Sequence, residues 1–446
     1  MSMEKIRDWL RENRITEVEC LVPDMTGKAR GKFIPADKFI KEDSRLPESI
    51  LVQTVTGDYT DIHDELVDPM DTDMSLEPDP NTMRLVPWAE DPTAMIIHDC
   101  YTRQGELHPL ASRNVLKRVL ALYEAEGWKP VVAPEVEFYL VQKNLDPDLE
   151  LEPPIGRSGR REAGRQSYSI DAANEFDPIM EDMYDFCEAQ RLDVDTLIHE
   201  SGMAQMEINF LHGNALDLAD QVFVFKRTMR ETALRHGIYA TFMAKPMEHE
   251  PGSALHIHQS IVDLETGRNI FTGDDEQEHP RFRHFIGGLQ QYTPGAIAFF
   301  APSVNSYRRF TPDIAAPVNL HWGYENRTTG LRVPDSSPQA RRLENRFPGV
   351  DANPYLAIAA SLACGYLGMN KAIDPTPPYR GDAFQEPITV ARSLEASLRL
   401  LERSDDLKEA MGEKFVKAYC AVKREEFEAF NKVISSWERE FLLLNV

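Results

Sequence analysis

The spacing of hydrophobic and polar positions predicts short strands and separate helices in the first quarter of the chain. Residues 4–14 have helical spacing, and the apolar run at residues 18–22 predicts a strand. The turn at residues 24–28 contains Asp, Thr and Gly, so this strand and the next are expected to form a hairpin. Residues 47–100 are rich in Asp and Pro with short apolar runs, which is typical of small strands joined by long loops.

A polar stretch at residues 103–109 marks the expected domain boundary, with an N-terminal domain over residues 1–105 and a larger domain over residues 106–446. Ser112 is placed to cap a helix whose apolar positions, including Val115 and Val119, share one face. Strands are then expected at residues 131–141, 198–211 (as two halves), 238–244 and 254–263, and helices at 174–190 and 216–236. The absence of regular βαβ spacing predicts an α+β fold.

Three of these strand-like runs carry residues that bind metal ions. Alternate residues of a strand lie on the same face, so Glu135 and Glu137 share a face inside a very apolar segment. The ordinary interpretation is a strand with its glutamates in water. If the two are instead buried side by side, they need a counter-cation.

The other two runs provide possible partners for these glutamates. Glu200 and Glu207 flank a turn within apolar sequence, and His256, His258 and Ser260 share one strand face. The His-x-His pair alone would also suit zinc, in a His/Glu metallohydrolase. With four glutamates nearby, an oxygen-rich site for Mg²⁺ or Mn²⁺ is favoured.

Seven arginines are concentrated within 39 residues of an acidic chain. They are Arg308, Arg309, Arg327, Arg332, Arg341, Arg342 and Arg346. Arg342, Glu344 and Arg346 alternate, which would suit a surface salt-bridge ladder or a site for phosphate and carboxylate groups. Arginines beside metal-binding glutamates favour phosphoryl transfer from a nucleotide. The Gly-Lys pairs of residues 26–32 lack the spacing of a phosphate-binding glycine loop and predict a hairpin turn.

The net charge of −24 argues against a nucleic-acid partner or an anionic membrane surface, because either would need a basic face. The five cysteines are far apart and form no C-x-x-C pair, which argues against a disulfide framework and predicts a reducing compartment. The N-terminus is charged and the longest apolar stretch is too short to span a bilayer, so a cytoplasmic location is expected.

Several motifs in order resemble the glutamine synthetase superfamily over nearly the whole chain. They lie at residues 134–138, 200–207, 252–258, 305–309, 326–327 and 341–348, the last leading to 352–356. Residues 430–441 are most similar to the ending of the γ-glutamylpolyamine (γ-glutamylputrescine) synthetase branch. The resemblance implies an N-terminal β-grasp domain and a catalytic domain with a curved antiparallel sheet and surrounding helices. It also implies a ring of subunits, commonly a dodecamer, with active sites between neighbours.

The same resemblance implies roles for individual residues. ATP and two to three Mg²⁺ or Mn²⁺ ions would bind. One metal ion would be held by Glu137, Glu200 and Glu207, and another by Glu135, His256 and Glu344. The nucleotide would be contacted by His258, Ser260, Arg327, Arg332 and Arg342, and glutamate by Gly252, Arg309 and Arg346. Arg309 and Arg327 would also take part in catalysis.

The resemblance implies ATP-dependent ligation of glutamate to an amine through a γ-glutamyl phosphate. Ammonia-using members carry a glutamate where this chain has Ala315, which favours a larger amine such as putrescine or spermidine. Asp58 is the candidate acid of the amine pocket, contributed by a neighbouring subunit. The alternatives are an ammonia-using glutamine synthetase and a non-catalytic structural or regulatory member of the family.

Overall fold

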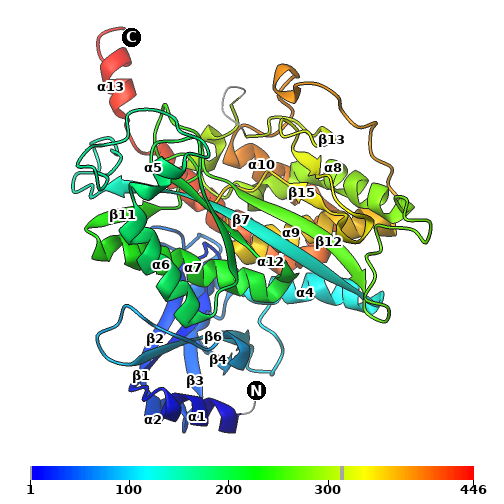
Figure 1. Cartoon of the computed structure of the whole chain (residues 1–446). Helices are drawn as coiled ribbons and strands as arrows, with labels where there is room; N and C mark the ends of the chain where they lie inside the picture. Colours follow the sequence, from blue (N-terminus) through cyan, green and yellow to red (C-terminus); the bar gives the residue numbers. More distant parts are fainter. Residues whose placement is uncertain (1–2, 312–315) are drawn as a thin grey trace.

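The structure, a computed structural model, describes residues 3–311 and 316–446 and contains two β-sheets with their own helices (Figure 1). The smaller sheet lies at the N-terminal end of the molecule and the larger one at its centre. The prediction of an α+β fold is confirmed. Ala315 lies outside the described residues.

The smaller sheet is built from strands within residues 17–101, in the order β2-β1-β6-β4-β3 with β5 paired to β6. The strands are β1 (Glu17–Pro23), β2 (Ala29–Pro35), β3 (Ser44–Pro47), β4 (Asp73–Pro78), β5 (Arg84–Leu85) and β6 (Thr93–Tyr101). β1 and β2 form the predicted antiparallel hairpin, whereas β1 and β6 run parallel. The helices here are α1 (Met3–Glu12), α2 (Ala36–Phe39) and α3 (His63–Leu66).

The larger sheet has the order β13-β14-β15-β12-β7-β9-β8, and β10 and β11 also pair with β7. The strands are β7 (Trp128–Gln142), β8 (Val194–His199), β9 (Gln205–Phe210), β10 (Gly213–Asn214), β11 (Ile238–Thr241), β12 (Leu255–Asp263), β13 (Trp322–Tyr324), β14 (Leu331–Val333) and β15 (Leu343–Asn345). Its pairs are antiparallel apart from β13 and β14, which run parallel. The long strand β7 is the centre of the sheet, because four other strands pair with it.

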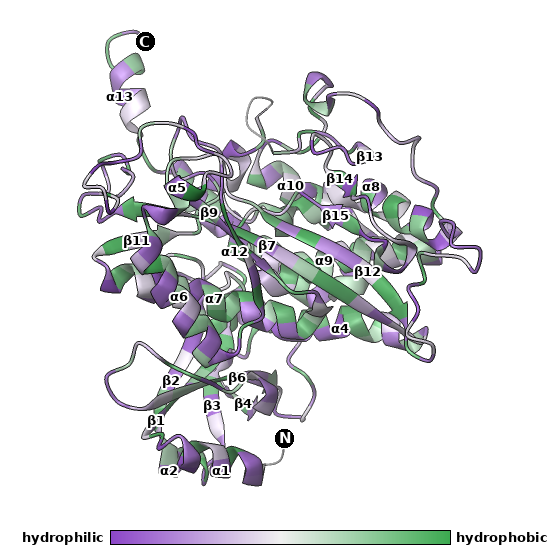
Figure 2. Ribbon diagram, viewed as in Figure 1, coloured by the Kyte–Doolittle hydropathy of each residue, from purple (hydrophilic) through white to green (hydrophobic). Residues whose placement is uncertain are grey.

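The remaining helices belong to the larger part of the chain, and several pack behind the larger sheet (Figure 1). They are α4 (Ser112–Ala125), α5 (Ile170–Asn174), α6 (Asp177–Gln190), α7 (Ala215–Arg235), α8 (Pro280–Phe300), α9 (Pro354–Asn370), α10 (Leu394–Glu402), α11 (Asp405–Met411), α12 (Glu413–Asn431) and α13 (Ser436–Leu442). Helix α9 is apolar on every side and is buried against α8, as Figure 2 shows by its mostly hydrophobic colouring. Among the described residues, no helix is long and apolar enough to cross a membrane.

Two local predictions differ from the structure. Ser112 does not cap α4: its hydroxyl instead donates to the carbonyl of Pro23 at 3.0 Å, because the turn after β1 packs against this end of the helix. The helix predicted at residues 174–190 begins three residues later, as α6, with Pro178 in its first turn, and the separate short helix α5 precedes it.

A buried arginine joins the smaller sheet to the catalytic part. Arg113 of α4 donates to Asp99 of β6 at 2.5 Å, to Asp79 after β4 at 2.6 Å and to Asp220 of α7 at 2.8 and 2.9 Å. Tyr355 of α9 also donates to Asp220, at 2.7 Å. The expected boundary near residue 105 is therefore crossed by buried ion pairs as well as by one continuous hydrophobic core.

Candidate active site

Strand pairing brings the predicted metal-binding residues onto one face of the larger sheet. Glu135 on β7 lies opposite His256 on β12, and Glu137 lies opposite Glu207 on β9. Because alternate residues share a face, the two glutamates of β7 point to the same side as their partners. The i, i+2 spacing found in the sequence thus becomes a row of ligand-type side chains across three adjacent strands.

These side chains line a cavity of about 280 Å³. Ten of the predicted residues line it: Glu135, Glu137, Glu200, Glu207, Gly252, His256, Arg309, Arg327, Arg332 and Arg346. They come from β7, β9, β12, β14 and several connecting segments. Residues that sequence analysis assigned to metal, nucleotide and glutamate therefore meet in one place.

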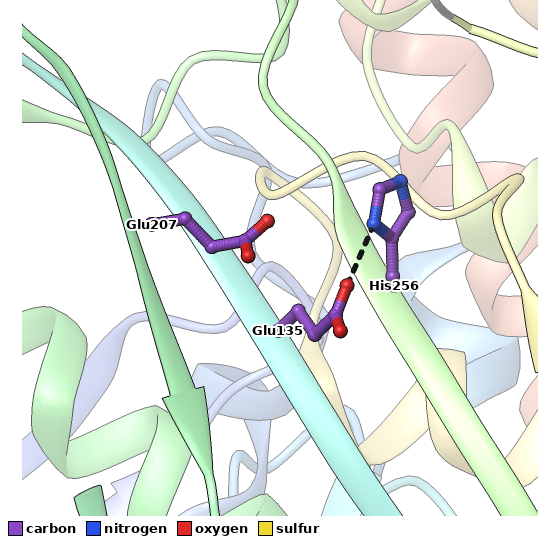
Figure 3. Close-up of side chains that lie close together, drawn as sticks. All are labelled: Glu135, Glu207 and His256. Carbon is purple, nitrogen blue, oxygen red and sulfur yellow. Dashed lines mark hydrogen bonds and ion pairs between the residues drawn. The ribbon is translucent and has the colours of Figure 1, made fainter. Parts of the chain in front are cut away.

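Glu135 is the meeting point of the metal-type ligands (Figure 3). One oxygen of Glu135 lies 3.1 Å from Nδ1 of His256, and the other lies 3.0 Å from Nε2 of His258. Two groups of ligand atoms are compact enough for an ion: Glu135, Glu207 and His256, and Glu135, His258 and Glu344. Both groups differ from the sets that the family resemblance implies. The first combines Glu207 with Glu135 and His256 in place of Glu137 and Glu200. The second has His258 where the resemblance implies His256.

The ionisation of the glutamates shows where positive charge is missing. Burial, together with like charge on neighbouring glutamates, raises the pKa of Glu137, Glu200 and Glu207 above the usual value. Burial alone would raise the pKa of Glu135 too, but hydrogen bonds from His256 and His258 lower it. A divalent cation would supply the missing charge, so this donor set fits Mg²⁺ or Mn²⁺.

Glu344 on β15 is bonded to two arginines, but one of them is not the predicted partner. Its carboxylate accepts from Arg346 and, at 2.7 Å, from Arg332 of the adjacent strand β14. Arg332 lies directly opposite Glu344 in the sheet. The predicted partner Arg342 instead donates to Nδ1 of His258 at 3.3 Å. Burial and the nearby Glu135 would raise the pKa of Glu344, but Arg346, His258 and His256 lower it to about 2.

A glycine allows the closest approach at the cavity wall. A Cβ atom on Gly252 would lie 2.2 Å from Cγ of Arg309 and 2.7 Å from the carbonyl oxygen of Ala244. Arg309 is buried and donates to the carbonyl of Phe347 at 3.0 Å, so its side chain has little room to move. The wall therefore accepts only glycine at position 252 without rearrangement.

Five predicted residues are not among those that line the cavity: Asp58, His258, Ser260, Arg342 and Glu344. His258, Arg342 and Glu344 are connected to it through the bonds to Glu135, His258 and Arg332 described above. Ser260 follows on the same strand face, farther along β12. Asp58 is exposed in a turn of the N-terminal part, where Thr56 donates to it at 2.7 Å.

The cavity also contains residues that sequence analysis did not select. Tyr168, Ile198, Asn209 and Ala316 line it. Asn209 could have been found, because it follows Glu207 by two positions on the same strand. Tyr168 has a positive φ of 61° in an irregular segment, and no periodic pattern marks such a position.

Comparisons with known proteins agree on one family. The family model for the glutamine synthetase catalytic domain matches residues 109–442. The γ-glutamylputrescine synthetase PuuA of Escherichia coli (strain K12) is 32% identical over 96% of this chain and 92% of its own. A glutamate–isopropylamine ligase of a Pseudomonas species is 31% identical over 97% and 96%. A glutamine synthetase of Pyrococcus woesei is 32% identical over 96% and 97%.

Solved structures extend the agreement to the whole fold. GmaS without ligand and GmaS in complex with ADP each match with a TM-score of 0.84 at 27% identity, over 98% of this chain and 99% of the other. The fold that the sequence motifs implied is thereby confirmed. The family model covers most of the chain, and the relatives align over nearly all of it. The chain therefore belongs to the glutamine synthetase family of ATP-dependent ligases.

Proposed function

We propose that this ligase joins the γ-carboxylate of glutamate to an alkylamine, with a polyamine such as putrescine or spermidine favoured, through a γ-glutamyl phosphate. Two relatives at 31–32% identity are named for amine substrates, putrescine and isopropylamine. The amine assignment rests on Ala315, at the position where the family resemblance implies a glutamate in ammonia-using members. An alanine there removes an ammonium ligand and opens space.

The glutamate substrate is assigned to the arginine side of the cavity. Arg309 and Arg346 supply guanidinium groups for its carboxylates, and Gly252 leaves room for its amino-acid end. The metal ligands are assigned to Glu137, Glu200 and Glu207 and to Glu135, His256 and Glu344. When bound, the divalent ions would neutralise charge on the transferring phosphoryl group.

The nucleotide is assigned to the opposite end of the same row of residues. His258, Ser260 and Arg342 would contact it, and Arg327 and Arg332 would stabilise negative charge on the phosphates during transfer. Arg327 is exposed at the cavity, free to meet an entering ligand. The match to a GmaS structure in complex with ADP supports a nucleotide at this site.

The amine is assigned to the part of the cavity that carries uncharged side chains. Tyr168, Ile198 and Ala316 are among the residues that line the cavity. An alkyl chain can be buried against such side chains, and a protonated amine can also bind the face of the Tyr168 ring. The amine must lose protons as it attacks, and Asp58 from a neighbouring subunit is the proposed acceptor.

Self-association into a ring, with a dodecamer as the expected size, follows from the same assignment. Asp58 does not line the cavity of its own chain, so a neighbour has to supply it. The C-terminal helix α13 projects away from the body (Figure 1), and Trp437, Phe441 and Leu444 on and after it are exposed. Such an apolar tail fits a subunit contact.

The five cysteines are all buried and unpaired, which supports a cytoplasmic location.

The second candidate function is glutamine synthesis from ammonia. The Pyrococcus glutamine synthetase is as similar to this chain as the putrescine-named relative, and this similarity favours it. The amine substrate separates the two candidates, since both need ATP, metal and glutamate.

A phosphate-release assay with ATP, Mg²⁺ or Mn²⁺ and glutamate tests the proposal. Putrescine, spermidine, isopropylamine and ammonium are compared at equal concentrations. We expect at least one alkylamine to give the highest kcat/KM. Turnover with ammonium alone would identify a glutamine synthetase, and no turnover with any amine would favour a non-catalytic member.

A variant of one position sharpens the assay. Ala315→Glu restores the carboxylate of ammonia-using relatives and should shift the preference toward ammonium by about tenfold or more. Ala315→Gln is the matched control, because it adds the same bulk without the charge. Equal preferences in the two variants would show that bulk, and not the missing carboxylate, sets the amine.

A further inference from the structure

A second cavity, of about 450 Å³, lies apart from the active site and shares no lining residue with it. It is enclosed by the turn between β1 and β2, the loop at Val55, helices α7 and α12, the end of β11, and residues 302–305 and 351–352. The Gly-Lys turn, whose spacing does not match a phosphate-binding glycine loop, forms part of its wall. Its volume is in the range of small-molecule sites, about 300–1,000 Å³.

Positive charge dominates the lining of this cavity, although the chain as a whole is strongly acidic. The four basic residues are Lys28, Lys226, Arg230 and Lys423, and the two acidic ones are Asp351 and Glu426. Both acids accept hydrogen bonds within the wall, although Oδ1 of Asp351 has no partner among the described residues. Glu426 accepts from Lys423 at 2.8 Å and from the amide of Val55 at 2.7 Å, and Asp351 accepts from the hydroxyls of Ser303 and Ser306.

Three of the cations are left without a carboxylate. Lys28 donates to the carbonyl of Val55 at 2.7 Å, and Lys226 donates to the carbonyls of Val350 and Ala352 at 2.5 and 3.0 Å. The guanidinium of Arg230 lies 5.0 Å from the centre of the Phe242 ring. Within residues 3–311 and 316–446, no carboxylate forms an ion pair with any of these three side chains.

Lys226 is the most buried of the three. Burial and the nearby Arg230 lower its pKa to about 7, against the opposing effect of Asp351. Backbone carbonyls satisfy two of its three hydrogen-bond donors but carry no net charge to balance the ammonium. An anion in the cavity would balance it, and the third donor remains to bind that anion.

The rest of the wall contains apolar side chains together with the polar Thr26, Thr241, Ser303 and Asn305. Val55, Phe242, Met243, Pro302 and Ala352 all face the cavity. A ligand that fits both parts of the wall has one anionic group and a short hydrocarbon body.

We propose that this cavity binds a small organic carboxylate, whose anionic group is held by Lys226, Arg230 and Lys28 and whose apolar body lies against Phe242 and Met243. The site is separate from the glutamate and nucleotide positions. It can be tested by binding alone, without reference to the amine that the ligase uses.

Isothermal titration of the full-length protein with straight-chain carboxylates, from acetate to hexanoate, tests this assignment. Affinity should rise with chain length as more hydrocarbon is buried. Arg230→Gln should weaken binding about tenfold, since it removes one charge-assisted hydrogen bond. Arg268→Gln, an exposed arginine that does not line the cavity, is the matched control and should bind as the wild type does.

Proton uptake provides a second, independent readout. Near pH 8 the Lys226 amine is mostly neutral, so binding of an anion should take up a proton, which titrations in buffers of different ionisation enthalpy measure. The charged groups around Lys226 are Arg230 on the same helix, Asp351, Lys28, and Lys423 and Glu426 of α12. Lys226→Met should abolish the uptake. Arg230→Gln keeps the test valid if Lys226→Met does not fold.

Three results would overturn the proposal. The first is no binding of any carboxylate, and the second is equal affinity in the wild type and Arg230→Gln. The third comes from a parallel titration with inorganic phosphate: tighter binding than any carboxylate, with the same dependence on Arg230, would replace the carboxylate by a phosphate-bearing ligand.

Discussion

Two clusters of buried acids in this molecule have opposite electrostatics. Around Arg113, the carboxylates of Asp79, Asp99 and Asp220 all accept from one guanidinium, and Tyr355 completes the set. In the active-site cavity, Glu137, Glu200 and Glu207 crowd together, and no cation within the described residues is bonded to any of them. Here burial and mutual repulsion raise the pKa of each glutamate.

The difference separates a structural cluster from a binding one. Burial lowers the pKa of Arg113, but Asp220 and Asp99 raise it by more than burial lowers it. The charges within this cluster therefore balance one another. The glutamate cluster leaves its compensation to a ligand. Buried acids that lack a bonded cation are thus one sign of a metal site, although Glu344 shows that a candidate ligand can also be paired with arginines.

The largest expected effect is on activity, from removing one charge of the glutamate cluster, which we call the open cluster because no cation of the described residues is bonded to it. Glu207→Gln should lower kcat about 10³-fold, since metal ligation contributes several kcal/mol to phosphoryl transfer. In metal-free buffer the same variant should be at least as stable as the wild type, because it relieves repulsion. Steady-state kinetics and urea unfolding with EDTA measure the two effects. Loss of stability together with loss of activity would make Glu207 structural and break the contrast.

The next effect is on stability, from removing Arg113, the cation that the carboxylates of the other cluster share. Arg113→Met removes the cation that three buried carboxylates share, leaving among the described residues only Asp99 with an ion pair, to Lys117, and should cost about 3–5 kcal/mol in the free energy of unfolding. Arg268→Gln, which breaks an exposed pair with Asp274, should cost less than about 1 kcal/mol. Urea unfolding monitored by circular dichroism compares them. A cost for Arg113→Met as small as that of the control would remove the distinction between the clusters.

The two clusters also differ in how far sequence could predict them. The active-site ligands were predictable because alternate spacing on a strand forces Glu135 and Glu137 onto one face, whatever their partners. The Arg113 cluster carries no such pattern. Its members come from β6, the segment after β4, α4 and α7, and only tertiary packing brings them together.

The hydrogen-bond partners within the site could not be predicted from the spacing of residues along the sequence. Glu344 pairs with Arg332 because β14 and β15 align these residues, and the register between strands is not encoded by either strand alone. Ser112 failed as a cap for the same kind of reason, since its hydroxyl met a carbonyl from a segment 89 residues away. Spacing predicted which residues share a face, whereas contacts between elements set which atoms they bind.

A smaller effect is expected from the wall that positions an active-site arginine. Gly252→Ala should raise the KM for glutamate about tenfold, because the added Cβ would displace Arg309 from its buried position. Gly164→Ala is the matched control, since a Cβ there would meet no atom within 4 Å. Substrate saturation curves for both variants measure the effect. An unchanged KM in Gly252→Ala would mean that Arg309 does not need its present position to bind glutamate.

The smallest expected effect is the pH dependence of stability that the three cavity glutamates produce. In metal-free protein the raised pKa values of Glu137, Glu200 and Glu207 mean that the folded state holds protons that the unfolded chain has already released. The stability that these three groups contribute is therefore greatest below the usual glutamate pKa of about 4.3, and should fall by about 1–2 kcal/mol as pH rises from about 5 to 8. Thermal unfolding in EDTA measures this slope, and saturating Mn²⁺ should flatten it, because the ion binds the deprotonated carboxylates. Glu207→Gln should flatten it without metal. An equal slope in the variant and the wild type would place the titrating charge outside this cluster, and the contrast with Arg113 would then rest on geometry alone.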